Sequence, residues 1–252
     1  MKNSLNKSQI ERFSRQLVLK NIGAKGQKKI LSAKILIIGI GGLGCPAAEN
    51  LVRAGIGTIG LVDNDVVNLS NIHRQSLFNS KDIKKLKVSV AAKKLKEINP
   101  LTKIKTYKAR INEKNIKNII KDYEIIIDGS DNFKTKFLIN DYCIKLEKKL
   151  ITGAISKFDG HIFTFDFNDK KTASLKSFYQ EEEISDDILN CEFDGVLGTT
   201  ATIVGTTQAN EALKMIMKIG QNLKNQILII DLLNLNFKKI KFKKDKIDLN
   251  NE

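Results

Sequence analysis

The sequence predicts an α/β protein with a Rossmann-like open sheet, mostly parallel, that has helices on both faces and a C-terminal antiparallel extension. Two patterns predict this fold. Between residues 35 and 152, short runs of apolar, largely β-branched residues alternate with segments of helical periodicity, which is typical of a parallel sheet built from strand–helix–strand units. Beyond Gly153, residues 158–162 resemble a hairpin turn and lead into the alternating segment 162–165, which indicates antiparallel strands.

Local patterns place the individual elements. Ser8 and Glu11 have the spacing of a capping box ahead of a helix over residues 9–19, and Pro100 ends a helix over residues 84–99. Another helix opens near Pro46 and stops at Gly55. We expect further helices at 27–31, 116–120, 133–146 and 201–219, and strands at 35–38, 58–62, 103–107, 124–127, 150–152, 226–231 and 236–242.

Length and composition describe an ordinary globular protein. The chain has 252 residues, of which 42% are hydrophobic and 28% are charged, so it can bury a core without disulfides. A disordered tail and a disulfide miniprotein are therefore excluded. No apolar run approaches the roughly 20 residues that span a bilayer, and residues 1–7 show no secretory signal. The chain has three cysteines, at positions 45, 143 and 191. This small and widely spaced set fits reduced thiols in the cytoplasm.

The formal net charge of +15 comes from 43 lysines and arginines against 28 acidic residues, and only five of the 43 are arginines. The lysines are scattered along the chain and are densest at residues 238–244. No interleaved aromatic platform for stacking bases is evident, so we interpret the charge as a solvated surface rather than a nucleic-acid interface.

A glycine-rich turn follows the first expected strand. Gly39, Gly41 and Gly44 have the G-x-G-x-x-G spacing, the turn opens a helix, and Asp63 closes the next strand. The motif alone is a weak signal, and this context makes it credible. Glycines let the backbone approach a phosphate at a helix N-terminus, and an acid at the next strand end can accept hydrogen bonds from ribose hydroxyls. These features predict a nucleotide site.

Further polar side chains follow the ends of the same strands. Asp131 follows another strand, and Lys87 lies in the first turn of a helix at the edge of its apolar stripe. In an open α/β sheet, ligands bind outside these strand ends. The cations Arg74 and Lys87, together with a carboxylate suited to Mg²⁺, favour a triphosphate over a pyrophosphate bridge. The candidate nucleotide-binding residues are Gly39, Gly41, Gly42, Gly44, Asp63, Asp65, Ser70, Asn71, Arg74, Lys87, Asp131 and Asn132.

Each of these residues alone also fits a structural role, as a surface ion pair, a snorkelling lysine or a helix cap. The joint pattern resembles the ATP-dependent adenylating enzymes of the MoeB/ThiF/HesA type, bacterial relatives of the ubiquitin-activating enzymes, and within them the molybdopterin-synthase/ThiS adenylyltransferase branch. The resemblance extends from about residue 10 to residue 242. The segments that carry it are 11–16, 39–45, 63–67, 70–75, 85–88, 128–132 and 195–197.

The resemblance implies a homodimer that binds ATP with Mg²⁺ and the tail of a small ubiquitin-like sulfur-carrier protein ending in Gly-Gly. The terminal carboxylate of the carrier attacks the α-phosphate and gives an acyl-adenylate and pyrophosphate. It also implies one adenylation domain over residues 1–252, with a helical arm (1–32), a nucleotide-binding core (33–153) and an antiparallel extension (154–252) that contains an acidic loop at 180–195.

The resemblance also implies roles for individual residues. Asp63 holds the ribose, Gly42 lies against the nucleotide and Asp131 holds Mg²⁺. Asn71, Arg74 and Lys87 hold phosphates. Arg15 reaches into the site of the partner subunit, and its helix lies outside the nucleotide-binding core. The candidate catalytic residues are Arg15, Arg74, Lys87, Asp131 and Cys191.

The cysteines depart from the family pattern. Many relatives carry two Cys-x-x-Cys pairs that bind a structural Zn²⁺, whereas this chain has neither pair. We therefore expect no zinc, so packing has to hold the extension unless it is loose. Cys191 is either a thiol that receives the activated carrier or an incidental cysteine, and its acidic neighbours should raise its pKa. Cys45 and Cys143 are expected to pack in the core.

Two alternatives remain open at the level of the sequence. A tRNA-modifying relative of the same family would adenylate a modified base, although residues 11–16 look more like the carrier-activating branch. A non-catalytic or NAD-binding Rossmann protein would share the fold but not the reaction. The pathway that is served, molybdopterin, thiamin or another thiolation route, is not fixed by the sequence.

Overall fold

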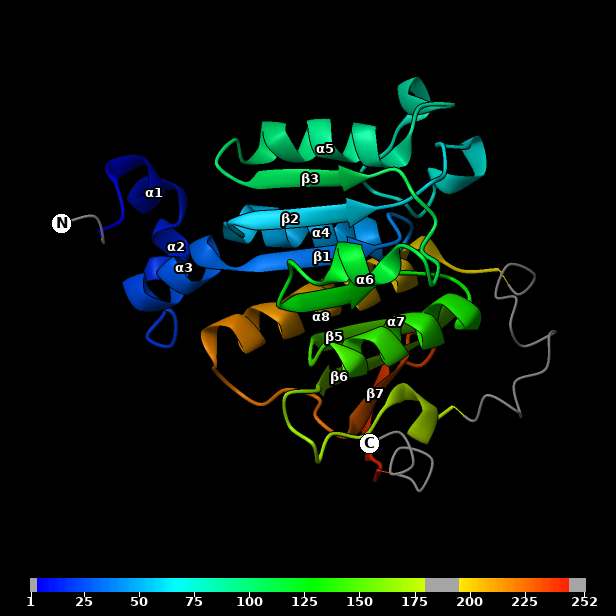
Figure 1. Ribbon diagram of the computed structural model, residues 1–252. Helices are drawn as coiled ribbons and strands as arrows, with labels where there is room; N and C mark the ends of the chain where they lie inside the picture. The colour runs from blue at the N-terminus through cyan, green and yellow to red at the C-terminus, as the bar shows by residue number, and fades with distance from the viewer. Residues whose placement is uncertain (1–3, 180–194, 245–252) are drawn as a thin grey trace.

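The computed structural model describes residues 4–179 and 195–244. Figure 1 shows how the helices and strands of these residues alternate along the chain. The helices are α1 (Lys7–Arg12), α2 (Ser14–Leu17), α3 (Gly23–Ser32), α4 (Gly44–Ala54), α5 (Lys87–Ile98), α6 (Ile116–Ile120), α7 (Phe133–Lys145) and α8 (Gly198–Met217). The strands are β1 (Lys34–Ile38), β2 (Thr58–Val62), β3 (Lys103–Tyr107), β4 (Ile125–Asp128), β5 (Lys149–Ser156), β6 (Asp159–Asp166), β7 (Gln226–Asp231) and β8 (Asn236–Lys241). Within these ranges, no helix is both long enough and apolar enough to cross a bilayer.

All of these strands form one sheet, in the order β3-β2-β1-β4-β5-β6-β7-β8. β3, β2, β1, β4 and β5 are parallel neighbours, and β6, β7 and β8 continue the sheet in antiparallel fashion. The predicted fold class, a mostly parallel open sheet with an antiparallel extension, is therefore confirmed.

Helices cover both faces of the sheet because successive side chains of a strand point to opposite sides. On β1, Ile35 and Ile37 join the apolar core that is shared with α4, α5 and α8, whereas Leu36 and Ile38 join the core that is shared with α6 and α7. A strand that is buried on both faces needs an unbroken apolar run. The apolar run at residues 35–38 is the pattern from which β1 was predicted.

The order of the strands reverses at β1, where the chain turns toward β2 and β3 on one side and toward β4 and β5 on the other. The register places Ile38 level with both Val62 and Asp128. The loops that leave β1, β2 and β4 therefore start side by side. This reversal is the point at which open α/β sheets bind ligands.

The N-terminal arm differs from the prediction of one helix over residues 9–19. The arm contains two short helices, α1 and α2, with a break at Phe13. Phe13 is 1% exposed, and a β-carbon on Gly55 would lie 2.5 Å from its Cζ atom. Burial of this ring against a distant turn outweighs the local preference for one continuous helix. The capping box is formed by Asn6 and Gln9, so the prediction of Ser8 and Glu11 was wrong.

Other boundaries shift by a few residues. α5 begins at Lys87 rather than at Lys84, whose φ of 68° is incompatible with a helix. The turn between β5 and β6 was expected over residues 158–162, but it consists of Lys157 and Phe158, because Ser156 pairs with Asp159 and β6 begins there. α3 begins at Gly23 rather than at residue 27, and α8 begins three residues before the expected start.

Aromatic rings anchor the antiparallel extension. The ring of Phe163 on β6 lies 5.1 Å from that of Phe178, 5.7 Å from that of Tyr179 and 5.9 Å from that of Phe242, measured between centroids. The steep angles between these rings are the favoured edge-to-face geometry. The contacts join β6 to the segment after Leu175–Ser177 and to the residue that follows β8, so packing ties the described parts of the extension together.

Replacing the central ring of this cluster should destabilise the protein. We predict that Phe163→Ala lowers the free energy of unfolding by about 3–5 kcal/mol, because it removes buried apolar area and leaves a cavity. Urea denaturation measures the effect. Phe237→Ala is the matched control, since Phe237 is 55% exposed on β8 and its loss should change stability by no more than about 0.5 kcal/mol. Equal stability of the two variants would contradict the anchoring role.

Candidate functional site

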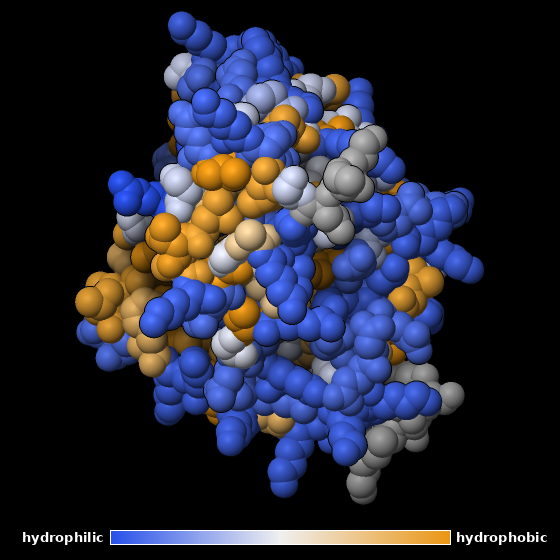
Figure 2. All heavy atoms as spheres, turned by 90° about the vertical axis from the view of Figure 1, so that its left-hand side faces the viewer, coloured by the Kyte–Doolittle hydropathy of each residue, from blue (hydrophilic) through white to orange (hydrophobic). Residues whose placement is uncertain are grey.

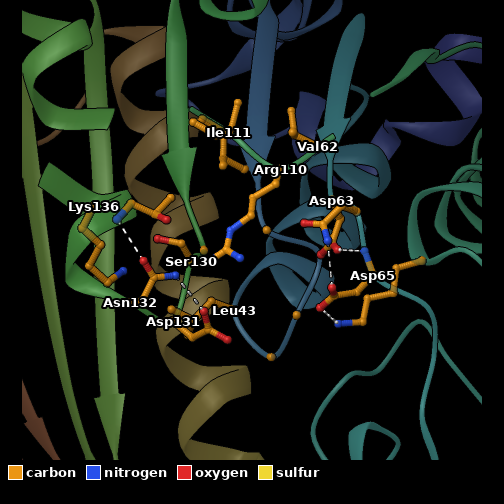
Figure 3. Close-up of a pocket in the computed structure, with 18 of the residues that line it drawn as sticks. Leu43, Val62, Asp63, Asp65, Arg110, Ile111, Ser130, Asp131, Asn132 and Lys136 are labelled. Carbon is orange, nitrogen blue, oxygen red and sulfur yellow. Dashed lines mark hydrogen bonds and ion pairs between the residues drawn. The ribbon is translucent and has the colours of Figure 1, made fainter. Parts of the chain in front are cut away.

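A cavity of about 420 Å³ opens at the carboxyl ends of the parallel strands (Figure 3). Its walls come from the loops after β1, β2, β3 and β4 and from the second half of β5. The candidate residues that line it are Gly39, Gly41, Gly42, Asp63, Asp65, Arg74, Lys87, Asp131 and Asn132. Residues that lie far apart in the sequence are thus brought to one cavity.

Some glycines of the glycine turn (residues 39–44) shape its backbone, and others face the cavity. Gly39 has a φ of 88°, and a β-carbon there would lie 2.8 Å from the carbonyl oxygen of Gly129. A β-carbon on Gly44 would lie 1.9 Å from the carbonyl oxygen of Gly39. Gly44 is absent from the cavity lining, so its role is to close the turn. Gly42 faces the Arg74 side chain and leaves the backbone open to a ligand.

Asp63 connects two of the loops. One carboxylate oxygen accepts a hydrogen bond from the backbone N–H of Ile40 at 2.8 Å, and the other accepts from the N–H of Asp65 at 2.8 Å. Each oxygen of an ionised carboxylate has a further lone pair. Asp63 can therefore accept hydrogen bonds from hydroxyl groups in the cavity while it fixes the glycine turn to the end of β2.

Lys87 is buried, and its ammonium group pairs with the Asp65 carboxylate at 3.2 Å. The backbone N–H of Lys87 also donates to the carbonyl of Asp65 at 3.0 Å. The side chain of Asp65 is 60% exposed, so the pair lies at the cavity wall with the acid toward solvent. Lys87 is thus a cation that is already oriented toward the cavity, which reduces the entropy lost when an anion binds.

Arg74 is held by the turn that precedes it. Its Nη1 atom donates to the carbonyl of Ser70 at 2.9 Å and lies 2.7 Å from Nε2 of His73. The carbonyl of Asn71 accepts hydrogen bonds from the N–H groups of Arg74 and Gln75. Ser70 and Asn71 are absent from the cavity lining. In this structure they support Arg74 rather than face the cavity themselves.

Asp131 and Asn132 lie where β4 leads into α7. Asn132 caps α7 by accepting from the N–H of Thr135 at 2.9 Å, and its amide donates to Asp131 at 3.3 Å. Asp131 is exposed and lines the cavity. Mg²⁺ bound with a nucleotide takes one or two carboxylates together with phosphate oxygens. One exposed carboxylate on the cavity wall fits that donor set.

The family was identified by comparison with known proteins. The ThiF family model matches residues 13–250. The chain belongs to the ThiF family. A probable molybdopterin-synthase adenylyltransferase from Gracilaria tenuistipitata var. liui is 40% identical over 238 residues, which are 94% of this chain and 66% of that protein. The chain therefore spans slightly less than two thirds of that relative.

A second relative agrees with this assignment, and a solved structure shares the fold. A sulfur carrier protein adenylyltransferase from Thermus thermophilus is 35% identical over 93% of this chain and 88% of that protein. A crystal structure of E. coli MccB with ATP superimposes with a TM-score of 0.82 and 20% identity, and covers 94% of this chain and 73% of that chain. At 20% identity the structural likeness shows the fold alone.

One candidate catalytic residue of this ThiF-family chain lies away from the cavity of its own chain, and another lies outside the described residues. Arg15 lies on α2, is exposed, and is absent from the cavity lining. α2 lies at the amino ends of the parallel strands, whereas the cavity lies at their carboxyl ends (Figure 1). Cys191 lies outside the described residues.

The other two cysteines are core residues, as predicted. Cys45 and Cys143 are both fully buried. Burial raises the pKa of the Cys45 thiol to about 12, and burial also raises the pKa of Cys143. Neither thiol is a nucleophile at neutral pH, because the thiolate is the reactive form.

Sequence reasoning missed a buried ion pair behind the Asp131 loop. The Asp128 carboxylate is completely buried and accepts from Lys136 at 3.1 Å, from Thr152 at 2.6 Å and from the backbone and hydroxyl of Ser130 at 2.9 and 2.6 Å. The Lys136 ammonium also donates to the carbonyl of Gly153 at 2.6 Å. A lysine at helical spacing within the apolar stripe of α7 is the signal that could have revealed this pair.

Arg110 is a second omission. It lies a few residues beyond Tyr107, the last residue of β3, and lines the cavity with its neighbours Ala109 and Ile111. Only the scarcity of arginine in the sequence could have drawn attention to it, because residues 108–112 carry no motif.

Removing one member of the buried pair should be destabilising. We predict that Lys136→Met lowers the free energy of unfolding by about 3–5 kcal/mol, because the Asp128 carboxylate is left buried without its cation. Urea denaturation at neutral pH measures the loss. Lys134→Met is the matched control, because Lys134 is exposed on the same helix. A Lys136→Met variant as stable as this control would show that the pair does not hold the loop.

Proposed function

We propose that this ThiF-family protein is an ATP- and Mg²⁺-dependent adenylyltransferase. Its substrate is a small ubiquitin-like sulfur-carrier protein, whose C-terminal Gly-Gly carboxylate it activates as an acyl-adenylate. One observation carries the proposal: Asp63, Arg74, Lys87 and Asp131 line a single cavity beside the glycine turn. That cavity offers a hydroxyl-binding acid, two cations and a metal-binding acid, which are the groups that a nucleoside triphosphate requires.

The relatives support the choice of substrate. The two curated relatives above are named a molybdopterin-synthase adenylyltransferase and a sulfur carrier protein adenylyltransferase. Both align with more than nine tenths of this chain. These names favour a carrier of the molybdopterin route, and thiamin biosynthesis is the second pathway that such a carrier would serve.

The reaction joins two anions, and this sets the task of the site. Two unit negative charges 4 Å apart repel by about 4 kcal/mol at an effective dielectric constant of 20. Positioned cations offset this repulsion, and Arg74 and Lys87 are held in place before substrate arrives. The site therefore catalyses adenylation by orienting the substrates and by electrostatic stabilisation. This step needs no nucleophile from the protein.

The bonds balance without a further reactant. An oxygen of the carrier carboxylate forms a bond to the α-phosphorus of ATP, the bond from that phosphorus to the bridging oxygen breaks, and pyrophosphate leaves with the electron pair. Asp63 accepts hydrogen bonds from the ribose, and Arg74 and Lys87 hold phosphate oxygens. Asp131 would hold Mg²⁺, which supplies positive charge to the phosphates when it is bound.

A homodimer would explain the position of Arg15, which lies far from the cavity of its own chain. Figure 2 shows the end of the molecule that carries the N-terminal arm, where apolar side chains gather. Exposed apolar residues of the arm are Ile10, Val18 and Leu19, at 50%, 75% and 52%. An apolar patch of this kind is typical of a protein interface. In the proposed dimer it brings Arg15 to the partner's site.

The proposed reaction is reversible, and exchange of labelled pyrophosphate into ATP tests it. We predict exchange only when a carrier with a free C-terminal Gly-Gly is present, since its carboxylate is the nucleophile. Lys87→Ala should lower the exchange rate by about 100-fold. Lys93→Ala, an exposed lysine on the same helix, should leave it unchanged.

The outcomes separate the alternatives. Exchange that depends on tRNA would favour the tRNA-modifying relative. A protein that is stabilised against heat by NAD and not by ATP with Mg²⁺ would be an NAD-binding Rossmann protein instead.

Arg15 gives an independent prediction. Arg15→Ala should lower carrier-dependent exchange by about 100-fold and leave the melting temperature unchanged, because Arg15 is exposed on α2. Lys20→Ala removes an exposed charge from the same arm and should behave as wild type. Mixing Arg15→Ala with a Lys87→Ala protein should restore part of the activity, because mixed dimers contain one intact site. Unchanged exchange in Arg15→Ala would defeat the assignment.

A further inference from the structure

Arg110 is a cation of the cavity to which neither the sequence nor the proposed reaction has given a role. Figure 3 shows its side chain reaching into the cavity between Asp63 and Ser130. Its backbone is fixed, because the carbonyl of Arg110 accepts hydrogen bonds from the side-chain amides of Asn112 at 3.3 Å and Asn115 at 2.9 Å. The loop after β3 therefore presents this side chain to the cavity from a defined position.

The other cations of the cavity are already engaged by the protein. Lys87 pairs with Asp65, and Lys136 pairs with Asp128. Arg74 donates to the carbonyl of Ser70. Among residues 4–179 and 195–244, no side chain or carbonyl accepts a hydrogen bond from the Arg110 guanidinium, and none forms an ion pair with it. A guanidinium has five donors arranged as a planar fork, which suits phosphate oxygens.

The neighbours of Arg110 indicate which part of a nucleotide it meets. Ile38, Val62 and Ile111 form an apolar wall of the cavity, which suits a nucleobase. Asp63 is the acid placed to bind ribose, and Asp131 is the acid placed for Mg²⁺ among the phosphates. The guanidinium lies between Asp63 and Ser130, the second residue after β4 and the one before Asp131 (Figure 3). It therefore faces the junction between the ribose and the first phosphate.

We propose that Arg110 binds the α-phosphate, the group at which bonds are made and broken. This assignment rests on the proposed function in that it takes the ligand to be an adenine nucleotide. The α-phosphate is the only phosphate kept in the acyl-adenylate after pyrophosphate leaves. Arg110 therefore retains the activated carrier in the site as well as binding ATP, which distinguishes it from a cation that meets only the departing phosphates.

Calorimetric titration of the protein with adenosine, with AMP and with ATP, each in the presence of Mg²⁺, tests this role. The three ligands differ only in the number of their phosphates. We expect Arg110→Ala to weaken the binding of AMP and of ATP by the same factor, about 10- to 100-fold. The affinity for adenosine should be unchanged. Arg110→Lys should recover part of the loss, since it keeps the charge but not the fork. Lys108→Ala is the matched control: it removes the same charge from the same exposed loop, and Lys108 is absent from the cavity lining.

Several results would overturn the assignment. If Arg110→Ala weakens the binding of adenosine as much as that of AMP, Arg110 contacts the nucleoside. If it weakens the binding of ATP alone, Arg110 contacts the outer phosphates. If Arg110→Ala and Lys108→Ala weaken the binding of AMP and ATP equally, Arg110 acts through the net charge of the loop and not through contact with a phosphate. A wild-type protein that binds neither AMP nor ATP would overturn this assignment and the proposed function together. Arg110-dependent binding of AMP and ATP without carrier-dependent exchange would overturn the proposed function alone.

Discussion

The common level at which β1, β2 and β4 end is the constraint on which the site depends. Ile38 is in register with Val62 on one side and with Asp128 on the other. Backbone hydrogen bonds along the parallel strands hold that register, and buried apolar side chains on both faces prevent it from slipping. The glycine turn, the Asp63 loop and the Asp131 loop therefore leave the sheet together. Residues that are far apart in the sequence become the walls of one cavity.

Several charged side chains of this cavity are fixed by the protein before any ligand binds. Asp63 holds the N–H groups of two loops, Lys87 pairs with Asp65, and the buried Asp128–Lys136 pair supports the turn that presents Asp131. Such preorganisation matters because the proposed reaction brings a carboxylate to a polyphosphate. Charges that are already oriented stabilise the transition state without the cost of reorganising solvent or side chains.

Features with a local cause were predictable from the sequence. The buried strands, the glycine turn at residues 39–44 and the stop of α4 at Gly55 are encoded by neighbouring residues, and the structure has them as expected. The break at Phe13 was not predictable, because it depends on a ring that packs against a turn about 40 residues away. The Asp128–Lys136 pair joins two neighbouring elements, and its signal in the sequence is the lysine within the apolar stripe of α7. Arg110 carries no motif, and its role arises only when the loops after β1, β2, β3 and β4 converge on one cavity.

The proposed function requires this cavity to bind a nucleoside triphosphate with its phosphates toward Arg74 and Lys87. A crystal structure of the protein with a non-hydrolysable ATP analogue and Mg²⁺ tests this requirement. We predict that the ribose hydroxyls lie on the Asp63 carboxylate and that phosphate oxygens lie within hydrogen-bond distance of Arg74 and Lys87. A nucleotide bound elsewhere, or one whose phosphates point away from both cations, would contradict it.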